Sequence, residues 1–91
     1  MTFERVRLAD FPALSLGIAA GRRGGAAPAV FNAANEEAVS LFLDRRIRFA
    51  DIPSAIESAL DSLGGQRGDS RDAILAADEA ARRHVRTRFQ C

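Results

Sequence analysis

The sequence predicts an all-α protein, a small bundle of four mostly antiparallel helices with a short extended N-terminal lead-in. Apolar residues recur with a helical period along most of the chain. Alanine is frequent and both Trp and Tyr are missing, a composition that suits closely packed helices better than a β-sandwich. The connections between the expected helices span roughly five to seven residues, which favours antiparallel neighbours.

The first helix is expected at roughly 11–21. Residues 1–9 have no helical period and are expected to be extended. Asp10 is a plausible cap, and Pro12 suits the first turn of a helix. Gly17 inside this helix costs on the order of 1 kcal/mol relative to Ala. We therefore expect another backbone or side chain to approach it closely.

The segment 21–28, GRRGGAAP, contains three glycines and two arginines. A Gly-rich loop before a helix can cradle phosphate on its backbone N–H groups. No strand precedes this one, however, and its glycine spacing matches neither the dinucleotide-binding nor the P-loop pattern. We interpret it as a plain connection between helices.

The second helix, roughly 28–45, is apolar over most of its circumference. One broad arc is expected to face the core, while Val39 and Leu43 form a second apolar strip, along which Asn32 and Asn35 also lie. A buried amide without a partner costs roughly 1 to 3 kcal/mol, so either this chain or a surface outside it should cover these amides. The broad arc consists of Val30, Phe31, Ala34, Ala38, Leu41 and Phe42.

The third helix is the most clearly amphipathic segment. Asp51 is expected to cap it, and Pro53 is tolerated in its first turn. Gly64 is well placed for the left-handed position after the helix. The apolar face consists of Ile52, Ala55, Ile56, Ala59, Leu60 and Leu63.

The fourth helix is expected to begin after a cap at Ser70 and to run to about Phe89. On its outer side, Asp78 and Glu79 stand four residues before Arg82 and Arg83, the favourable orientation for helical ion pairs. Its inward residues are expected to be Ala73, Ile74, Ala77, Ala81 and Val85.

Few residues offer chemistry. His84, the only histidine, falls on the apolar face of the fourth helix, and we interpret it as a packed residue reaching for a carbonyl rather than a metal ligand or base. Glu36 and Glu37 are interpreted as favouring the dipole of the second helix. No Ser or Cys has the base and orienting group that a nucleophile needs, and Lys is missing.

Charge and hydropathy exclude several classes of partner. Thirteen basic residues, all Arg, oppose twelve acidic ones for a net charge of +1, so no global field attracts nucleic acid or an anionic membrane. No apolar run resembles a signal peptide or a membrane span, and we expect a soluble, cytoplasmic protein. The single cysteine, Cys91, cannot form an internal disulfide.

Residues 24–52, GGAAPAVFNAANEEAVSLFLDRRIRFADI, resemble the C-terminal domain of the 1-deoxy-D-xylulose 5-phosphate reductoisomerase family. The resemblance covers nearly all of the chain from about Phe11, and NAANE is a specific signal in this setting. The matching motifs are FPALSLG at 11–17, GGAAPAV at 24–30, NAANE at 32–36, FL at 42–43, I-R-F-x-D-I at 47–52, and Asp78, Ala81 and Arg82 in the last helix.

The resemblance implies a supporting domain that is inactive alone. Enzymes of this family rearrange and reduce deoxyxylulose phosphate to methylerythritol phosphate in non-mevalonate isoprenoid biosynthesis, using NADPH and a divalent metal (Mg or Mn), usually as homodimers. Their nucleotide-binding segment, metal-binding acidic residues, substrate motif and lid have no counterpart in this sequence. Residues 1–10 would be the end of an interdomain linker and 11–91 the helical bundle.

This reading supplies a role for the asparagines. We expect Asn32, Asn35 and the Val39/Leu43 strip to contact the catalytic and NADPH-binding domains, with Glu36 near the margin, and no catalytic, cofactor-binding or metal-binding residue in this chain. Two alternatives stay open. The asparagines could instead fasten the second helix to loops within the bundle, or the chain could be a free-standing helical protein-interaction module derived from that domain.

Overall fold

The structure, a computed structural model, describes residues 12–66 and 68–89. These residues form four helices and no strand, which confirms the predicted all-α class. The expected extended lead-in, the cap at Asp10 and the thiol of Cys91 lie outside the described residues. The helices are α1 (Pro12–Arg23), α2 (Ala27–Leu43), α3 (Asp51–Leu63) and α4 (Arg71–Arg88).

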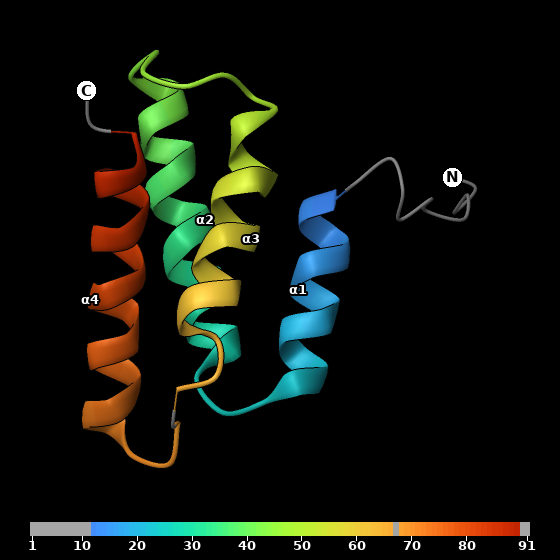
Figure 1. The fold of residues 1–91 in the computed structure, drawn as a ribbon, viewed down its shortest axis with the longest axis vertical. Helices are drawn as coiled ribbons and strands as arrows, with labels where there is room; N and C mark the ends of the chain where they lie inside the picture. Colours follow the sequence, from blue (N-terminus) through green and yellow to red (C-terminus); the bar gives the residue numbers. More distant parts are fainter. Residues whose placement is uncertain (1–11, 67, 90–91) are drawn as a thin grey trace, which may run out of the picture.

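Consecutive helices run in opposite directions, as predicted (Figure 1). α2 packs against each of the other three helices, and α1 also packs against α3. α1 and α4 lie on opposite sides of the α2–α3 pair (Figure 1). The alternation of direction makes α2 and α4, which are not consecutive, run parallel to one another along a shared contact.

The core consists mainly of small side chains. The largest fully buried ones are Val30, Ile56 and Val85, each from a different helix. Buried alanines surround them and let the helices approach closely, as in other densely packed interiors. These alanines are Ala20, Ala26, Ala27, Ala33, Ala34, Ala38, Ala55, Ala59, Ala77 and Ala81.

The predicted inward face of α4 is only partly correct. Ala77, Ala81 and Val85 are fully buried, but Ile74 is 40% exposed. The first turns of α4 extend beyond the ends of α2 and α3 (Figure 1), so this part of its apolar face has less of the neighbouring helices to pack against.

The predicted cap is present on α4 and missing on α3. The Ala73 N–H donates to Ser70 Oγ over 3.1 Å. Asp51, in contrast, is the first residue of α3, and its side chain does not cap the helix. Instead Asp51 Oδ2 accepts a hydrogen bond from the Arg48 N–H over 2.8 Å. Asp51 therefore closes the loop that precedes α3.

The prediction for Gly64 is also wrong. Its φ is −65°, within the right-handed helical region. Arg23 Nη1 donates to the Leu60 carbonyl over 3.3 Å, and a Cβ on Gly64 would lie 2.6 Å from that nitrogen. Glycine at this position makes room for an arginine from α1. Left-handed residues instead follow α1, at Gly24 with φ 72°, and α2, at Arg45 with φ 61°.

Two expectations about the glycines of α1 and the following connection are confirmed. The ring of Phe31 lies over Gly17, where a Cβ would come within 2.9 Å of ring atom Cζ. In the 21–28 segment, the N–H groups of Gly24, Ala26 and Ala27 donate to the carbonyls of Ala20, Gln66 and Gly24, respectively. Since these donors have partners inside the fold, they are not available to cradle a phosphate. The connection is shorter than predicted and spans only 24–26, because 21–23 belong to α1 and 27–28 to α2.

Candidate interaction surface on α2

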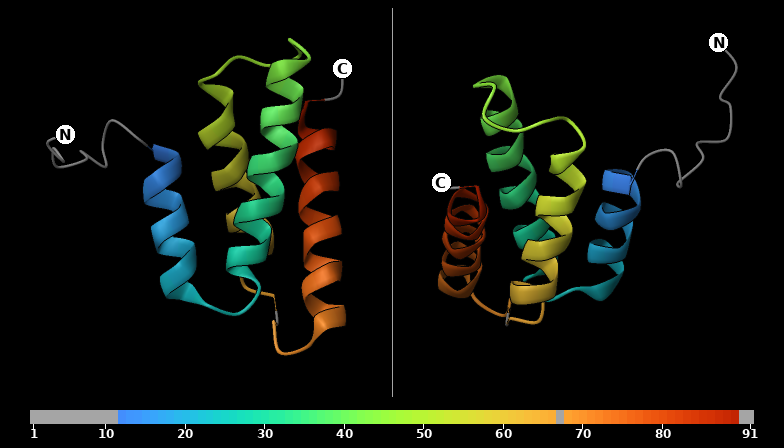
Figure 2. Two further views of the ribbon diagram at one scale, coloured as in Figure 1. Left: turned by 180° about the vertical axis from the view of Figure 1, so that it is seen from behind. Right: turned by 45° about the horizontal axis from the view of Figure 1, so that its top comes forward.

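The predicted contact residues lie on the outward face of α2. We call Asn32, Asn35, Glu36, Val39 and Leu43 the outer strip. Their spacing of three or four residues places them along one side of the helix. Seen from behind, α2 lies in front of α3, between α1 and α4, and none of the four described helices covers this side (Figure 2).

The apolar members of the outer strip differ in exposure. Leu43 is 73% exposed, whereas Val39 is partly buried and packs against the core. Phe49, from the loop after α2, is 72% exposed and makes an edge-on contact with Phe42, with ring centroids 5.6 Å apart. The C-terminal end of α2 therefore presents apolar side chains to its surroundings.

This chain by itself does not cover both amides. Asn32 is exposed and Asn35 is half-buried, because the bundle leaves this side of α2 uncovered. Within the described part of the chain, neither amide forms a hydrogen bond, and no side-chain polar atom is buried without a partner. The structure thus contains no fastening of α2 to an internal loop through these two residues.

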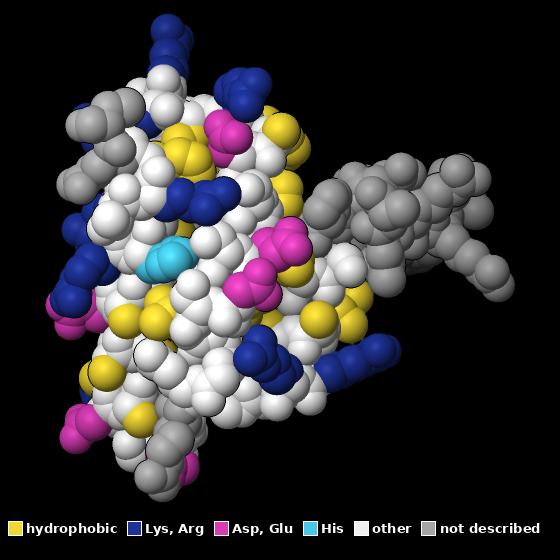
Figure 3. Space-filling view, viewed as in Figure 1, with side chains coloured by type: hydrophobic (Ala, Val, Ile, Leu, Met, Phe, Trp, Pro, Cys, Tyr) yellow, Lys and Arg dark blue, Asp and Glu magenta, His cyan; other side chains and the backbone are white. Residues whose placement is uncertain are grey.

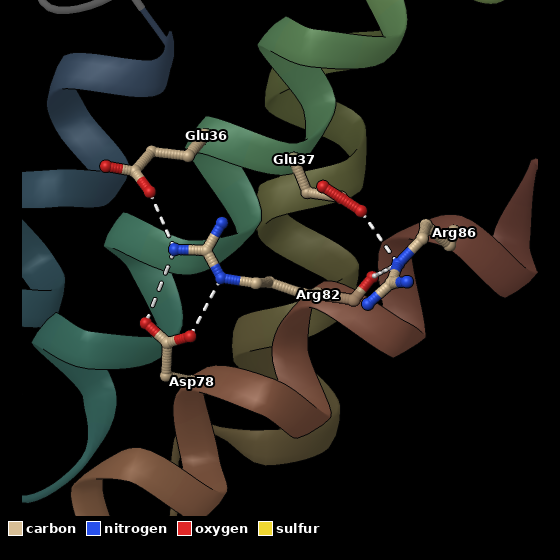
Figure 4. Close-up of polar contacts among 5 residues, drawn as sticks. All are labelled: Glu36, Glu37, Asp78, Arg82 and Arg86. Atoms are coloured by element: carbon tan, nitrogen blue, oxygen red, sulfur yellow. Dashed lines mark hydrogen bonds and ion pairs between the residues drawn. The ribbon is translucent and has the colours of Figure 1, made fainter.

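Glu36 forms the margin of the strip nearest α4. It accepts a hydrogen bond from Arg82 Nη2 over 2.6 Å. The same guanidinium donates through Nε to Asp78 Oδ1 over 2.8 Å, so one cation joins carboxylates from two helices (Figure 4). The hydrogen bonds that Arg82 donates to Asp78 and, to a smaller extent, to Glu36 raise the pKa of Arg82 above its ordinary value, which keeps it charged.

Glu37 joins α2 to α4 in a second ion pair. Its Oε1 lies 2.7 Å from Arg86 Nε, and its side chain is only 19% exposed. The two pairs lie side by side because Glu36 and Glu37 are adjacent and Arg82 and Arg86 are one helical turn apart (Figure 4). The cross-helix pairs tie the parallel helices together.

The dipole interpretation of the two glutamates is therefore wrong. The first turn of α2 contains no acidic residue, and the helix dipole acts mainly within the first turn. The partners from α4 explain their presence instead. The predicted pairs within α4 are confirmed: Arg82 bonds to Asp78, and Arg83 Nη2 lies 3.0 Å from Glu79 Oε1.

His84 is half-buried on α4, as the sequence indicates, but its partner is a hydroxyl and not a carbonyl. The distance between its Nε2 and Ser58 Oγ on α3 is 2.9 Å. Residues 12–66 and 68–89 contain no group of three or more His, Cys, Asp or Glu that could hold a metal ion. No helix among them is long and apolar enough to cross a membrane.

Comparison with known proteins identifies the family. The family model described as the DXP reductoisomerase C-terminal domain matches residues 1–84. The chain belongs to this family. This agrees with the resemblance carried by the NAANE motif, which lies on α2 and includes three members of the outer strip.

The relatives that match this DXP reductoisomerase C-terminal domain are much longer than the chain. The chain is 49% identical over 88 residues to a 1-deoxy-D-xylulose 5-phosphate reductoisomerase from Heliobacterium modesticaldum, and the match covers 97% of this chain and 22% of the relative. A Synechococcus relative of the same name is 50% identical over 92 residues, which cover 99% of this chain and 23% of the relative. The chain thus spans less than a quarter of these relatives.

Sequence reasoning missed the two arginines that hold α2 to α4. Arg82 and Arg86 occur in a basic C-terminal segment, and only Arg82 has an acidic residue four positions earlier. Glu36 and Arg82 are 46 positions apart in the sequence, so no local spacing connects them. The only sequence signal for these cross-helix ion pairs is weak. It consists of two arginines four positions apart on one helix and two adjacent glutamates on another.

Proposed function

We propose that this chain acts as the supporting C-terminal domain of a DXP reductoisomerase. In this proposal its outer strip packs against the catalytic and NADPH-binding domains of the same enzyme, which works as a homodimer. NADPH and the divalent metal belong to the other domains, and no step of the rearrangement and reduction passes through residues of this chain.

The observation that supports this role most directly is the state of the outer strip. It exposes Leu43 on the same side of α2 as the unpartnered amides of Asn32 and Asn35, in a chain that corresponds to 22% of a reductoisomerase relative. Amides with free hydrogen-bonding groups and a neighbouring apolar side chain suit a polar-rimmed contact with another folded surface. The ion pairs of Glu36 and Glu37 with α4 hold α2 in place behind that surface.

A chimaeric enzyme tests this proposal. The part of the Synechococcus relative that matches this chain would be deleted or replaced by residues 1–91, and NADPH oxidation would be followed with 1-deoxy-D-xylulose 5-phosphate and Mg²⁺. We expect no activity from the enzyme that lacks this part, which we call the deleted enzyme, or from the chain alone. Activity should be restored in the chimaera. NADPH oxidation by the chain alone, or full activity of the deleted enzyme, would contradict the supporting role.

The alternative of a free-standing interaction module makes a different prediction. Such a module would need no covalent link to the other domains and would contribute nothing to their stability. A chimaera with the same melting temperature and activity as the deleted enzyme would favour that alternative.

A further inference from the structure

A groove lies between α3 and α4, on the side of the bundle away from the outer strip. Its volume is about 470 Å³, and Leu63 and Ala80 contribute apolar walls. Its polar lining consists of Ser58, Arg83, His84, Thr87 and Arg88. The single histidine is visible at the surface between the two helices, with arginine side chains beside it (Figure 3).

Three of these residues form a hydrogen-bonded chain across the groove. Arg88 Nη1 donates to Ser58 Oγ over 3.4 Å, and Ser58 Oγ lies 2.9 Å from His84 Nε2. A guanidinium has only donors, so the Ser58 oxygen accepts from it and the Ser58 proton can be donated to a neutral His84.

Arg88 has no carboxylate partner among the described residues. Arg88 also donates from Nη2 to Ser54 Oγ over 3.1 Å, and both acceptors are neutral hydroxyls. Hydrogen bonds between a guanidinium and an oxyanion are stronger than those to neutral acceptors. An oxyanion entering the groove would therefore be a better partner for Arg88 than the two serines.

The charges around the groove favour an anion. Arg83 shares its charge with Glu79 through a 3.0 Å pair at the surface, and Arg88 adds an uncompensated positive charge. On α3, Glu57 and Asp61 are exposed and do not line the groove. The hydroxyls of Ser58 and Thr87 supply further donors.

We propose that this groove binds a tetrahedral oxyanion, as phosphate or sulfate, between Arg88, Arg83 and the Ser58–His84 pair. The apolar walls leave room for a small organic group attached to the oxyanion. The site is independent of the proposed interdomain contact, because the outer strip of α2 lies on the other side of the bundle (Figures 2 and 3).

The Ser58 hydroxyl can also serve the oxyanion. In the His84 tautomer with its ring proton on Nε2, Nε2–H donates to Ser58 Oγ over 2.9 Å, and the Ser58 hydroxyl is free to donate to the oxyanion.

Sulfate is the suitable probe because its own charge does not change near neutral pH. We would titrate the whole chain with sodium sulfate at constant ionic strength, replacing chloride, and follow the NMR signals of His84 and its neighbours. We expect shifts of these signals that saturate as the sulfate concentration rises. Signals that do not move, or move equally with chloride, would overturn the proposal.

Variants separate the roles of the residues. Arg88→Gln should weaken sulfate binding about tenfold, while Ser58→Ala, which removes one hydroxyl donor but no charge, should weaken it less. Arg71→Gln removes the same charge from α4 at a position outside the groove and should bind as the unaltered chain does. Equal weakening by Arg71→Gln and Arg88→Gln would reduce the effect to net charge and overturn the site.

Repeating the titration with inorganic phosphate and glycerol 3-phosphate tells whether the free ion or a monoester binds more tightly.

Discussion

Arg82 on α4 donates a 2.6 Å hydrogen bond to Glu36 on α2, across 46 positions of sequence. The contact is notable because α2 and α4 run parallel and are not consecutive. It holds the outer strip of α2 against the rest of the bundle and places a carboxylate at the margin of the strip. Arg82 is the one described residue that bonds to acidic groups of both helices.

Replacing Arg82 by Met should destabilise the chain by about 1 kcal/mol, since both of its ion pairs are partly exposed. Thermal or urea unfolding measures the difference. Arg83→Met is the matched control, because its pair with Glu79 is about 70% exposed on both sides and exposed pairs contribute little. An equal loss in the two variants would contradict a special role for Arg82.

The contribution of Arg82 should not depend on pH near neutrality. Its pKa is raised in the folded state, so its contribution is fully present below the unfolded pKa and is lost only as the pH rises through the folded value. We expect the stability difference between the unaltered chain and Arg82→Met to stay constant from about pH 6 to about pH 9. A difference that disappears within this range would exclude the ion pairs as its cause.

The glycines of α1 should respond differently to alanine. Gly21→Ala places its Cβ in open space and should stabilise the chain by about 0.5 to 1 kcal/mol through helix propensity. Gly17→Ala gains the same propensity, but its Cβ meets the Phe31 ring at 2.9 Å, so the gain should be reduced or reversed. Melting temperatures of both variants test this, and a gain from Gly17→Ala equal to that from Gly21→Ala would show that the ring moves freely.

Ser70→Ala should cost about 1 kcal/mol, because it removes the side-chain acceptor of the Ala73 N–H at the start of α4. Ser62→Ala changes an exposed serine of α3 and serves as the control. Unfolding in urea compares the two. Indistinguishable midpoints for Ser70→Ala and the unaltered chain would mean that water replaces the cap at no cost.

Asn35→Ala distinguishes an interdomain role from an internal one. The amide makes no hydrogen bond within the described residues and Ala is the better helix former, so we expect an unchanged or slightly higher melting temperature in the chain alone. In the chimaeric enzyme, a contact made by the amide should be lost at a cost of about 1 kcal/mol, which differential scanning calorimetry detects. A loss of the same size in both contexts would favour the internal role.

Leu43→Asp tests the apolar part of the outer strip. In the chimaera it should lower the melting temperature and weaken activity, because a carboxylate would be buried in the proposed contact. The isolated chain should tolerate the change, since Leu43 is 73% exposed. Leu75→Asp is the matched control, an exposed leucine on α4. Equal losses from Leu43→Asp and Leu75→Asp in the chimaera would argue against a contact through α2.

Local sequence determined the helices and most of their buried faces. The recurrence of apolar residues every three or four positions predicted four helices, with most of their ends correct to within about two residues. The serine before α4 predicted its cap. The pattern also identified Gly17 as a point of close approach. These features depend on residues within one or two helical turns, whose relative positions the helix itself sets.

Only the tertiary structure decided which faces were covered and which distant residues met. Periodicity placed Asn32 and Asn35 on one side of α2 but could not tell that this side stays open, because that depends on where the other helices pack. The partners of Glu36 and Glu37, the Arg23 side chain at Gly64 and the Ser58–His84 bond all join residues more than 25 positions apart. Their contacts follow from the relative placement of whole helices, which no local spacing encodes.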